Sequence, residues 1–593
     1  METKSTTVKG GEFLIRSSLP ESVFTPEDYT EEHKMLRDAI RDFINKEIEP
    51  LKETFDSKEG TKLAPEILEK LGELGFLAIS APESIGGMGC DIKTNLAASE
   101  VMSDSFSFSQ TLGVQRGLGV NTILFYGSNE QKTKYLDKIL TGKLKCSYCL
   151  TEPGAGSDAN SGKTKATLSE DGKHYILNGQ KMWITNAGFA DIFSVFCKID
   201  DDENLSCLIV EKEWGVQLGA EENKLGIHGS STRQVFFENV KVPVENLLGE
   251  RDKGFKIAMN ALNMGRLMIG IAGSAISKRA FNLGVQYANQ RVQFKKPIAS
   301  FGAIQEKIAK MAVGIYTLES GWNRLGGDMD VLLEEFKSNG GVDALKAKQQ
   351  VAQEFAAECS IIKVFGSEVE QFVVDEALQI HGGMGFSGES EISMHYRNIR
   401  GNRIYEGTNE INRLVIPSTI LKYAMKGKLP LMQLSMETFQ EVQAGNLEPI
   451  TTHTNFQETA SSFLEHCKKA FFLISGQAIQ KFQQEIQEQQ QVLSKLSDII
   501  SQIYMLESVI LRTLKTKEEH RDIPEAISKL LMNESADRIK IAAKEVTFTS
   551  VETDMAAMTL KTIGKLLQLP GYDVISLRRK VATYFIKENQ YNI

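Results

Sequence analysis

The chain has 593 residues, of which 41% are hydrophobic and 24% are charged, values typical of a soluble globular protein with several buried cores. Its formal net charge is −9, so electrostatics give no general case for nucleic acid or an anionic membrane surface as a partner. No apolar run is long enough to suggest a membrane span.

The N-terminus and the cysteines both favour a reducing cytoplasm. Residues Met1 to Thr7 are polar, with neither the apolar core of a signal peptide nor an arginine-rich transit pattern. Seven cysteines in so long a chain are typical of free thiols. Cys146 and Cys149 form a C-x-x-C, but no second Cys/His pair follows at ligand spacing, so two thiols in a half-buried strand are expected and no metal site.

Residues 1–144 are predicted to form a helical domain. Thr25-Pro26-Glu27-Asp28 is a helix start signal, with a capping hydroxyl, a proline and early acids. Helical spacing of apolar residues follows at Leu36, Ile40, Phe43, Ile44 and Ile48. Further helices are expected over Pro65–Leu74 and, two or three of them, between Asn95 and Leu140.

Residues 145–252 change to short β-rich runs separated by turn residues. The dipeptides Asp171-Gly172 and Asn178-Gly179 are typical of turns or hairpins. The expected strands are 175–177, 181–185, 192–196, 208–210 and 235–237. This pattern predicts a small antiparallel barrel or sandwich.

Helical periodicity returns over residues 253–425, predicted to be a helical bundle with breaks near Gly326, Gly340 and Gly382. Residues 426–593 are predicted to be an additional helical domain, which begins with a proline-bearing linker. One face of it carries Phe482, Ile486, Leu493, Leu496, Ile500, Ile503 and Ile510. The predicted fold class is therefore mainly α with a central β domain.

Tyr405-Glu406-Gly407-Thr408 is the strongest candidate for catalysis. Glycine beside the carboxylate lets a substrate approach the backbone closely. A glutamate that is desolvated becomes a stronger base, able to remove a weakly acidic proton from carbon. From Glu-Gly alone, the alternative is a glutamate in a surface loop.

Two glycine-rich segments match the dinucleotide pattern G-x-G-x-x-G/A, at 154–159 and 383–388. That pattern needs a strand before it and a helix after it, and neither segment is expected to have both. The first segment can instead expose backbone N–H groups beside the hydroxyls of Thr151 and Ser157. Trp183 and Thr185 would add an aromatic wall and another hydroxyl, an arrangement suited to a flat heterocycle with polar edges. The alternative is that Trp183 is plain core.

Four segments in one order resemble motifs of the acyl-CoA dehydrogenase family: 149–158, 178–186, 379–386 and 405–408. The resemblance extends over residues about 30 to 425. The chain length, the segment Leu262-Asn263-Met264-Gly265-Arg266 and the helical tail make it most similar to the very-long-chain branch. The implied fold has an N-terminal helical domain, a β domain, a four-helix bundle and an extra helical domain.

The resemblance implies FAD as the cofactor and Glu406 as the catalytic base. Some family members place the base on the 263–266 segment, but Gly265 cannot serve here. The implied FAD contacts are Tyr148, Leu150, Thr151, Gly156, Ser157, Trp183, Ile184, Thr185, Thr408 and Glu410, with Arg291, Gln293, Phe294, Gln379, Gly382 and Gly383 supplied across a dimer interface. The implied substrate contacts are Ser157, Asn263, Arg266, Tyr405 and Gly407.

The implied reaction is the oxidation of an acyl-CoA to a trans-2-enoyl-CoA in fatty acid β-oxidation. Glu406 would remove the α-proton while the β-hydride passes to flavin N5, and an electron-transfer flavoprotein would take the electrons. Long-chain substrates are expected, because Gly113, Gly117 and Gly119 fall where the family's acyl channel runs. The tail implies a homodimer, and the few basic residues of 425–452 give membrane contact little support.

Three alternatives stay open. A short- or branched-chain dehydrogenase would act on smaller acyl-CoAs, and an acyl-CoA oxidase would differ in its reactivity with oxygen. A non-enzymatic assembly factor on the same fold would have lost its flavin chemistry. Met394 and Asn398 depart from the family, which usually has a basic residue and often an aspartate there; both are expected to affect local packing only.

Overall fold

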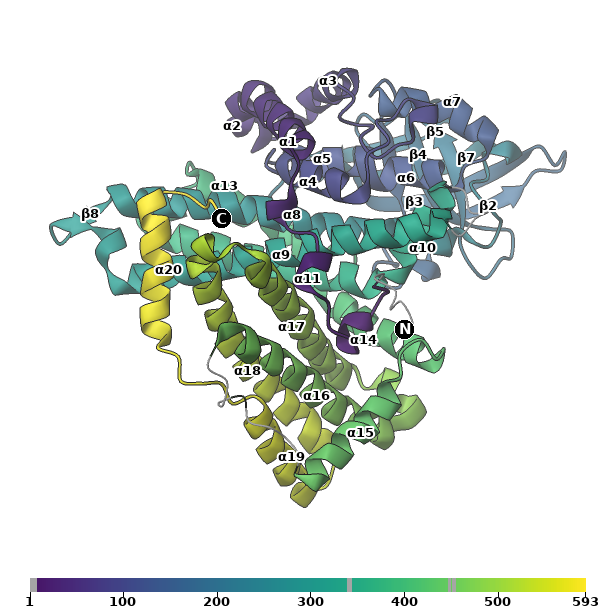
Figure 1. Ribbon diagram of the computed structural model, residues 1–593. Coiled ribbons are helices and arrows are strands. Elements are labelled where there is room, and N and C mark those ends of the chain that lie inside the picture. Colours follow the sequence, from purple (N-terminus) through teal and green to yellow (C-terminus); the bar gives the residue numbers. More distant parts are fainter. Residues whose placement is uncertain (1–7, 339–343, 446–449, 451–454) are drawn as a thin grey trace.

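The computed structural model describes residues 8–338, 344–445, 450 and 455–593. The N-terminal helices and the sheet occupy one end of the molecule, long helices run through the middle, and the C-terminal helices form the other end (Figure 1). The expected fold class, mainly α with a central β region and an extra C-terminal helical region, is confirmed.

The N-terminal region is helical up to Leu140. Thr30 begins the first long helix, because its hydroxyl accepts a hydrogen bond from the His33 N–H. The expected start signal at Thr25 caps a separate short turn, Pro26–Asp28, instead. The helices are α1 (Glu31–Phe43), α2 (Lys52–Phe55), α3 (Gly60–Glu73), α4 (Ile92–Ser103), α5 (Phe108–Gly113), α6 (Val120–Tyr126) and α7 (Asn129–Leu140), with π-helical turns η4 (Ile44–Ile48) and η7 (Val114–Gly119).

The middle region is a seven-stranded sheet in the order β1-β4-β2-β3-β7-β6, with β5 paired to β4. The expectation of a purely antiparallel sheet was wrong, since β4 pairs in parallel with both β1 and β2. Neither pair is a tight hairpin, so chain direction is not restricted by a short turn. The strands are β1 (Cys146–Cys149), β2 (Lys165–Leu168), β3 (His174–Thr185), β4 (Ile192–Ile199), β5 (Ser206–Glu211), β6 (Gln217–Glu221) and β7 (Thr232–Pro243).

The two turn dipeptides have different outcomes. Asp171-Gly172 does form the turn between β2 and β3, with Gly172 at φ 67°. Asn178-Gly179 does not turn but lies inside β3, at a shift in register with β7. A Cβ at Gly179 would come within 2.6 Å of the Thr164 hydroxyl, so glycine is needed there for close approach rather than for a turn.

The central helices carry most of the core. The helices α8 and α11 approach each other so closely that a Cβ at Gly366 would lie 2.7 Å from the Gly270 Cα. The expected break at Gly326 is absent, because this glycine lies inside α9. A Cβ there would lie 3.0 Å from the Leu96 side chain, so the glycine allows close packing. The other expected break, at Gly340, lies outside the described residues. The elements are α8 (Gly254–Gln290), β8 (Val292–Gln293), β9 (Lys296–Pro297), α9 (Gly302–Ser338), α10 (Ala344–Glu354), α11 (Ala356–His381), α12 (Gly383–Phe386), α13 (Glu391–Ile399), η12 (Arg400–Arg403) and α14 (Asn409–Met425).

The C-terminal helices follow the expected apolar face, with one interruption. Leu493, Leu496, Ile500, Ile503 and Ile510 are all buried, but the helix breaks at Gln483, where φ is 47°. Within the described ranges, no helix has both the length and the apolar character of a membrane span. The helices are α15 (Leu431–Ala444), α16 (Phe456–Phe482), α17 (Gln490–Lys515), α18 (Asp522–Ser550), α19 (Thr553–Leu566) and α20 (Val574–Glu588), with η14 (Gln483–Glu488) between α16 and α17.

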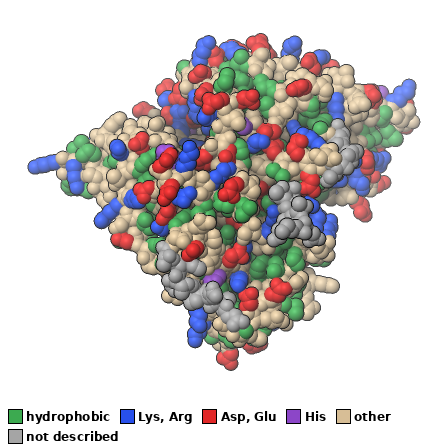
Figure 2. Space-filling model, in the orientation of Figure 1, with side chains coloured by type: hydrophobic (Ala, Val, Ile, Leu, Met, Phe, Trp, Pro, Cys, Tyr) green, Lys and Arg blue, Asp and Glu red, His purple; other side chains and the backbone are tan. Residues whose placement is uncertain are grey.

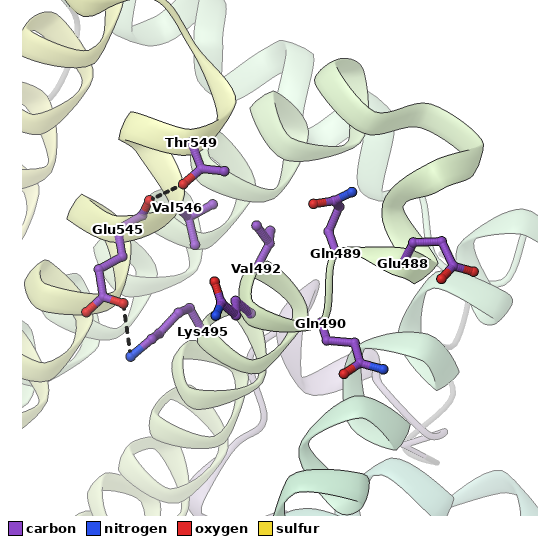
Figure 3. A pocket seen from close by; sticks show the side chains of 9 residues that line it. Glu488, Gln489, Gln490, Val492, Lys495, Glu545, Val546 and Thr549 are labelled. Carbon is purple, nitrogen blue, oxygen red and sulfur yellow. Dashed lines mark hydrogen bonds and ion pairs between the residues drawn. The ribbon is translucent and has the colours of Figure 1, made fainter.

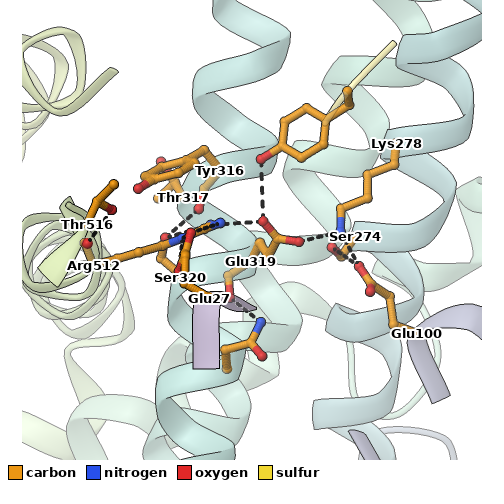
Figure 4. Close-up of polar contacts among 12 residues, drawn as sticks. Glu27, Glu100, Ser274, Lys278, Tyr316, Thr317, Glu319, Ser320, Arg512 and Thr516 are labelled. Carbon is orange, nitrogen blue, oxygen red and sulfur yellow. Dashed lines mark hydrogen bonds and ion pairs between the residues drawn. The ribbon is translucent and has the colours of Figure 1, made fainter. Parts of the chain in front are cut away.

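A chain of charged side chains, of which Arg512, Glu319 and Glu100 are buried, joins this C-terminal region to the rest (Figure 4). Arg512 of α17 donates to Glu319 of α9 at 2.8 Å and also pairs with Glu27 at 2.8 Å. Lys278 of α8 pairs with Glu319, and with Glu100 of α4 at 2.6 Å. The outer surface is different: on the face that Figure 2 shows, acidic and basic side chains are interspersed.

Candidate active site

Glu406 lies in the short loop between η12 and α14, where two successive residues have left-handed backbone angles. The φ of Glu406 is 56° and that of Gly407 is 79°. This conformation is ordinary for glycine but costs about 1–3 kcal/mol for a non-glycine residue, and such strain tends to occur at functional sites. Thr408 then caps α14 by accepting a hydrogen bond from the Ile411 N–H at 3.2 Å.

Three side chains hold this loop by its carbonyl oxygens. The Asn412 amide donates to the carbonyls of Glu406, Gly407 and Thr408 at 3.3, 2.8 and 3.1 Å. Lys363 of α11 donates to the Gly407 carbonyl at 2.8 Å, and Arg266 of α8 donates to the Glu406 carbonyl at 3.3 Å. The nearby cations therefore bond to the backbone and leave the Glu406 carboxylate itself free.

The carboxylate of Glu406 lies over Gly265. A Cβ at residue 265 would be 3.1 Å from both Cδ and Oε2 of Glu406, tighter than most real contacts. The sequence excluded Gly265 as a base, and the structure adds that glycine there makes room for the Glu406 carboxylate. Glu406 Oε2 is buried and has no hydrogen-bond partner among the described residues.

The electrostatic surroundings of Glu406 suit proton exchange near neutral pH. Burial raises its pKa, and the charges of Arg266 and Lys363 oppose that rise, which leaves the pKa at about 7. A base with a pKa near the working pH is ionised often enough to act and basic enough to take a proton. Burial also lowers the pKa of Lys363, to about 8.

Two expected substrate residues form a buried pair behind the loop. Arg266 donates to the Asn263 side-chain oxygen at 3.0 Å, and the Asn263 amide donates to the Ala352 carbonyl at 3.3 Å. Both are buried, so their first role in this structure is to support one another and the Glu406 loop.

The glycine-rich loop after β1 is held from behind by a buried ion pair. Lys181 of β3 donates to Glu152 at 2.7 Å and to the Leu150 carbonyl at 3.0 Å. The Met182 N–H donates to the Thr151 carbonyl at 3.0 Å, which joins loop to strand. A Cβ at Gly154 or Gly156 would meet nothing within 4 Å, so the outer side of the loop is open.

Trp183 and Tyr148 border the same region. Trp183 has a φ of 59° and a 52% exposed side chain, so it is not the plain core residue that the alternative reading allowed. The Tyr148 hydroxyl donates to the Ala258 carbonyl of α8 at 3.4 Å. Burial raises the Tyr148 pKa first, and the charge on Glu406 raises it further.

The FAD residues expected from across a dimer interface lie elsewhere, around a projecting arm at the ends of α8 and α11. The strand β8 extends well away from the sheet (Figure 1). The side chain of Phe294 is 87% exposed, and Arg291, Gln293, Gln379, Gly382 and Gly383 are also exposed. Tyr287 stacks on His381 with 4.4 Å between ring centroids, which places the two helix ends together. The chain thus presents these residues as a second cluster, apart from Glu406.

Several smaller expectations can be compared with the structure. Cys146 and Cys149 are buried free thiols, and no metal-ligand cluster occurs among the described residues. Met394 packs in the N-terminal helical core, while Asn398 accepts a hydrogen bond from the Ile227 N–H. A Cβ at Gly119 would collide with Cys146 Sγ at 2.4 Å, so this glycine serves helix–strand packing.

A pocket of about 300 Å³ lies in the C-terminal region between α17 and α18 (Figure 3). Its lining is mostly glutamine and charged side chains, with Lys495 paired to Glu545 at 3.1 Å. None of the expected site residues lines it.

Sequence reasoning missed the residues that support the loops. Lys363 and Asn412 lie outside the four segments that resemble family motifs. Glu152 and Lys181 lie within two of these segments, but they are 29 positions apart and nothing in the sequence shows that they form a pair. A buried charge within an apolar helix is the only available signal, and Lys363 has it: it lies in the run Ile361-Ile362-Lys363-Val364-Phe365.

Comparison with known proteins shows which protein family this fold resembles. Acyl-CoA dehydrogenase domain models match four parts of the chain: the N-terminal domain over 30–143, the middle domain over 147–240, and C-terminal domains over 252–421 and 466–565.

Individual relatives agree with the domain matches. A probable acyl-CoA dehydrogenase of Bacillus subtilis is 41% identical, over 99% of this chain and 98% of that protein. The crystal structure of an acyl-CoA dehydrogenase complexed with FAD from Bacillus anthracis has a TM-score of 0.94 at 40% identity, covering 99% of this chain and 100% of the other. The mitochondrial very long-chain specific acyl-CoA dehydrogenase of Rattus norvegicus is 38% identical over 66% of this chain and 58% of its own length.

These domain matches and relatives define an oxidoreductase of the flavoenzyme type. The chain belongs to the acyl-CoA dehydrogenase family.

Proposed function

We propose that this protein is an FAD-dependent acyl-CoA dehydrogenase that forms a trans-2-enoyl-CoA, with Glu406 as the base that removes the α-proton. The observation that carries the proposal is the Glu406 carboxylate, buried over Gly265 with one oxygen unpartnered and a pKa of about 7. A substrate α-proton presented to Oε2 would meet an acceptor that makes no competing hydrogen bond.

The residues around the glycine-rich loop fit FAD. Open space beside Gly154 and Gly156 lets a polar ring edge or phosphate approach the backbone N–H groups. The exposed Trp183 ring offers a stacking surface next to Thr185. Bound here, FAD supplies the hydride acceptor for the β-carbon. The second cluster, around Phe294 and Gln379, would serve the FAD of a partner subunit in a homodimer.

The chain's own contribution to the reaction is position and exclusion of water. Arg266, Lys363 and Asn412 fix the backbone of the Glu406 loop, so the carboxylate does not have to be ordered when substrate arrives. Positive charge from Arg266 and Lys363 keeps part of the Glu406 population ionised in spite of burial. When the α-proton leaves, negative charge grows on the thioester carbonyl, and the Glu406 N–H is proposed to be a donor to it.

For substrate and partner we propose a long-chain acyl-CoA and an electron-transfer flavoprotein, in fatty acid β-oxidation. The open space beside Gly113 and Gly117 on α5 and η7 is compatible with a deep acyl channel, whereas Gly119 is occupied by packing. The similarity to very long-chain specific relatives supports the same choice. Seven free cysteines are compatible with a reducing compartment such as the cytoplasm.

The test is an anaerobic titration of the purified, FAD-loaded protein with acyl-CoAs from butyryl to stearoyl, following flavin bleaching. Bleaching is expected with the wild type, strongest for long chains. Replacing Glu406 by Gln should slow it roughly 10³- to 10⁴-fold, the upper range for loss of a general base. Rapid bleaching in Glu406→Gln would remove Glu406 from the mechanism.

Glu358→Gln is the matched control. Glu358 is also buried, and burial likewise raises its pKa to about 7, but its partner is the Gly11 N–H at 2.7 Å, in the N-terminal segment. Its replacement should leave the rate of bleaching within about twofold of wild type, since surroundings away from the reacting atoms contribute no proton transfer.

A further inference from the structure

A second buried carboxyl group, that of Glu370, is linked to the Glu406 loop by hydrogen bonds and has no part in the mechanism so far. Glu370 of α11 is 0% exposed. The glycines at the contact of α8 with α11 close the space around it: a Cβ at Gly273 would be 2.9 Å from the Gly366 carbonyl oxygen and 3.5 Å from the Glu370 Cβ. Water is therefore kept from this carboxyl group by backbone packing.

Glu370 makes one hydrogen bond, and that bond leads toward the base. The Asn402 amide, 2% exposed, donates to Glu370 Oε2 at 2.8 Å. The side-chain oxygen of the same Asn402 accepts a hydrogen bond from the Tyr405 hydroxyl. Tyr405 directly precedes Glu406, so three side chains connect the α8–α11 contact to the catalytic loop.

The protonation state of Glu370 follows from its partners. No cation pairs with it, and its Oε1 has no hydrogen-bond partner among the described residues. Burial raises its pKa to about 8, so at neutral pH it is mostly a neutral acid. A neutral acid can accept from Asn402 without placing a second negative charge near Glu406.

We propose that Glu370 is a positioning residue, which acts through Asn402 to fix the Tyr405 ring as a wall of the acyl site beside Glu406. This rests on the proposed function, since it assigns a role relative to the base. Tyr405 is suited to that role because its hydroxyl donates to Asn402, the partner of Glu370, while its backbone directly precedes Glu406. Its ring also packs on Gly401, where a Cβ would be 2.6 Å from Tyr405 Cε1.

A purely structural role is the competing explanation, and it predicts different data. If Glu370 only filled space, its loss would lower stability and, through the folded fraction, the apparent kcat, but it would leave KM unchanged. If it positions Tyr405, its loss should alter substrate binding, and that effect should depend on the Tyr405 hydroxyl.

The experiment compares KM and kcat for one acyl-CoA in the FAD-loaded protein and its variants. Glu370→Gln keeps a neutral acceptor of the same size and should leave KM within about twofold of wild type. Glu370→Leu leaves the Asn402 amide unpaired and should raise KM roughly tenfold with a smaller change in kcat. Tyr405→Phe, which removes one hydroxyl, should raise KM by a similar factor.

The double variant decides between the two explanations. With Tyr405→Phe in place, Glu370→Leu should add little further change in KM, because both act through one chain of hydrogen bonds. Independent, multiplying effects would overturn the inference. Glu358→Leu is the control for stability alone: its melting temperature should fall, with KM unchanged.

Two outcomes keep this inference separate from the proposed function. Should Glu370→Leu fail to fold, Tyr405→Phe still carries the test, and an unchanged KM in that variant overturns the inference. If Glu406→Gln is inactive while both Glu370→Leu and Tyr405→Phe keep wild-type KM, only the role of Glu370 is lost. If Glu406→Gln stays active, the proposed function is lost whatever these variants do.

Discussion

The Glu406 loop and the Glu100–Glu319 network are two buried carboxylate regions built in opposite ways. At the loop, the nearest cations donate to carbonyl oxygens, and the carboxylate Oε2 has no partner. In the network, Glu100 sits between Lys278 at 2.6 Å and Arg37 at 2.9 Å. Burial alone would raise the Glu100 pKa, but those two cations lower it to about 2.

The difference teaches what a buried acid is used for. A carboxylate held directly between cations stays ionised at any physiological pH and joins helices to one another. A carboxylate whose cations are turned toward the backbone keeps a pKa near neutrality and can exchange a proton. The largest expected effect on the catalytic side of this comparison is the loss of bleaching in Glu406→Gln described above.

Breaking the network should cost stability and leave the chemistry intact. Arg512→Met removes the shared partner of Glu27 and Glu319 and leaves Lys278 as the remaining cation beside the buried Glu319. Losing a partner from a buried ion pair costs up to about 3–5 kcal/mol, and Lys278 reduces that cost here, so the melting temperature should fall by a moderate amount. The measurement is thermal unfolding together with the bleaching rate at low temperature.

Arg538→Met is the matched control for that variant. Arg538 also lies in the C-terminal region, but it is 60% exposed and 3.9 Å from Glu534, so its loss should change the unfolding free energy by less than about 1 kcal/mol. A bleaching rate that drops in Arg512→Met without a loss of stability would contradict the division between the two regions.

Adding a methyl group beside the Glu406 carboxylate should lower activity less than replacing Glu406 does. In Gly265→Ala the new methyl group lies 3.1 Å from the Glu406 carboxylate and must displace it by a few tenths of an ångström. Because catalysis is sensitive to sub-ångström misplacement, kcat should fall roughly tenfold. Gly302→Ala, at the open start of α9, serves as the control and should leave kcat unchanged.

The pH dependence of kcat/KM gives the smallest and most diagnostic effect. Glu406 must be ionised to act, and its pKa is about 7, so kcat/KM should rise with pH and level off above that value. Lys363 lowers the Glu406 pKa, so Lys363→Met should move the rising limb to higher pH. A limb that stays in place would show that Lys363 only anchors the Gly407 carbonyl.

The sequence predicted the parts of this molecule that depend on local pattern. The helical face from Leu493 to Ile510 follows from spacing. Glu406 was proposed as the base from the glycine beside it and from the resemblance of residues 405–408 to a family motif, and Gly265 was excluded as a base from its identity. The prediction of a turn at Asn178-Gly179 was wrong. The sequence alone cannot distinguish a glycine that forms a turn from one that is needed for close approach to Thr164. The predicted helix break at Gly326 was wrong for the same reason, because this glycine makes room for Leu96, which lies on another helix.

Hydrogen-bonded pairs of residues that are distant in the sequence could not be predicted from it. Glu370 and Asn402 are 32 positions apart and meet because α11 passes behind the η12 turn. Lys363 reaches the Gly407 carbonyl across 44 positions. No periodicity encodes such contacts, so the supporting residues of the site could not be separated from ordinary polar residues.

The glycine contact between α8 and α11 has a consequence for mutational surveys. Gly270 follows Arg266 by one helical turn and Gly366 follows Lys363 by three residues, so both anchors of the Glu406 loop lie next to the point where the two backbones touch. A methyl group at either glycine would push the helices apart and carry both anchors with them. A library screened for activity alone would therefore score Gly270 and Gly366 with the catalytic residues, although neither meets a reacting atom.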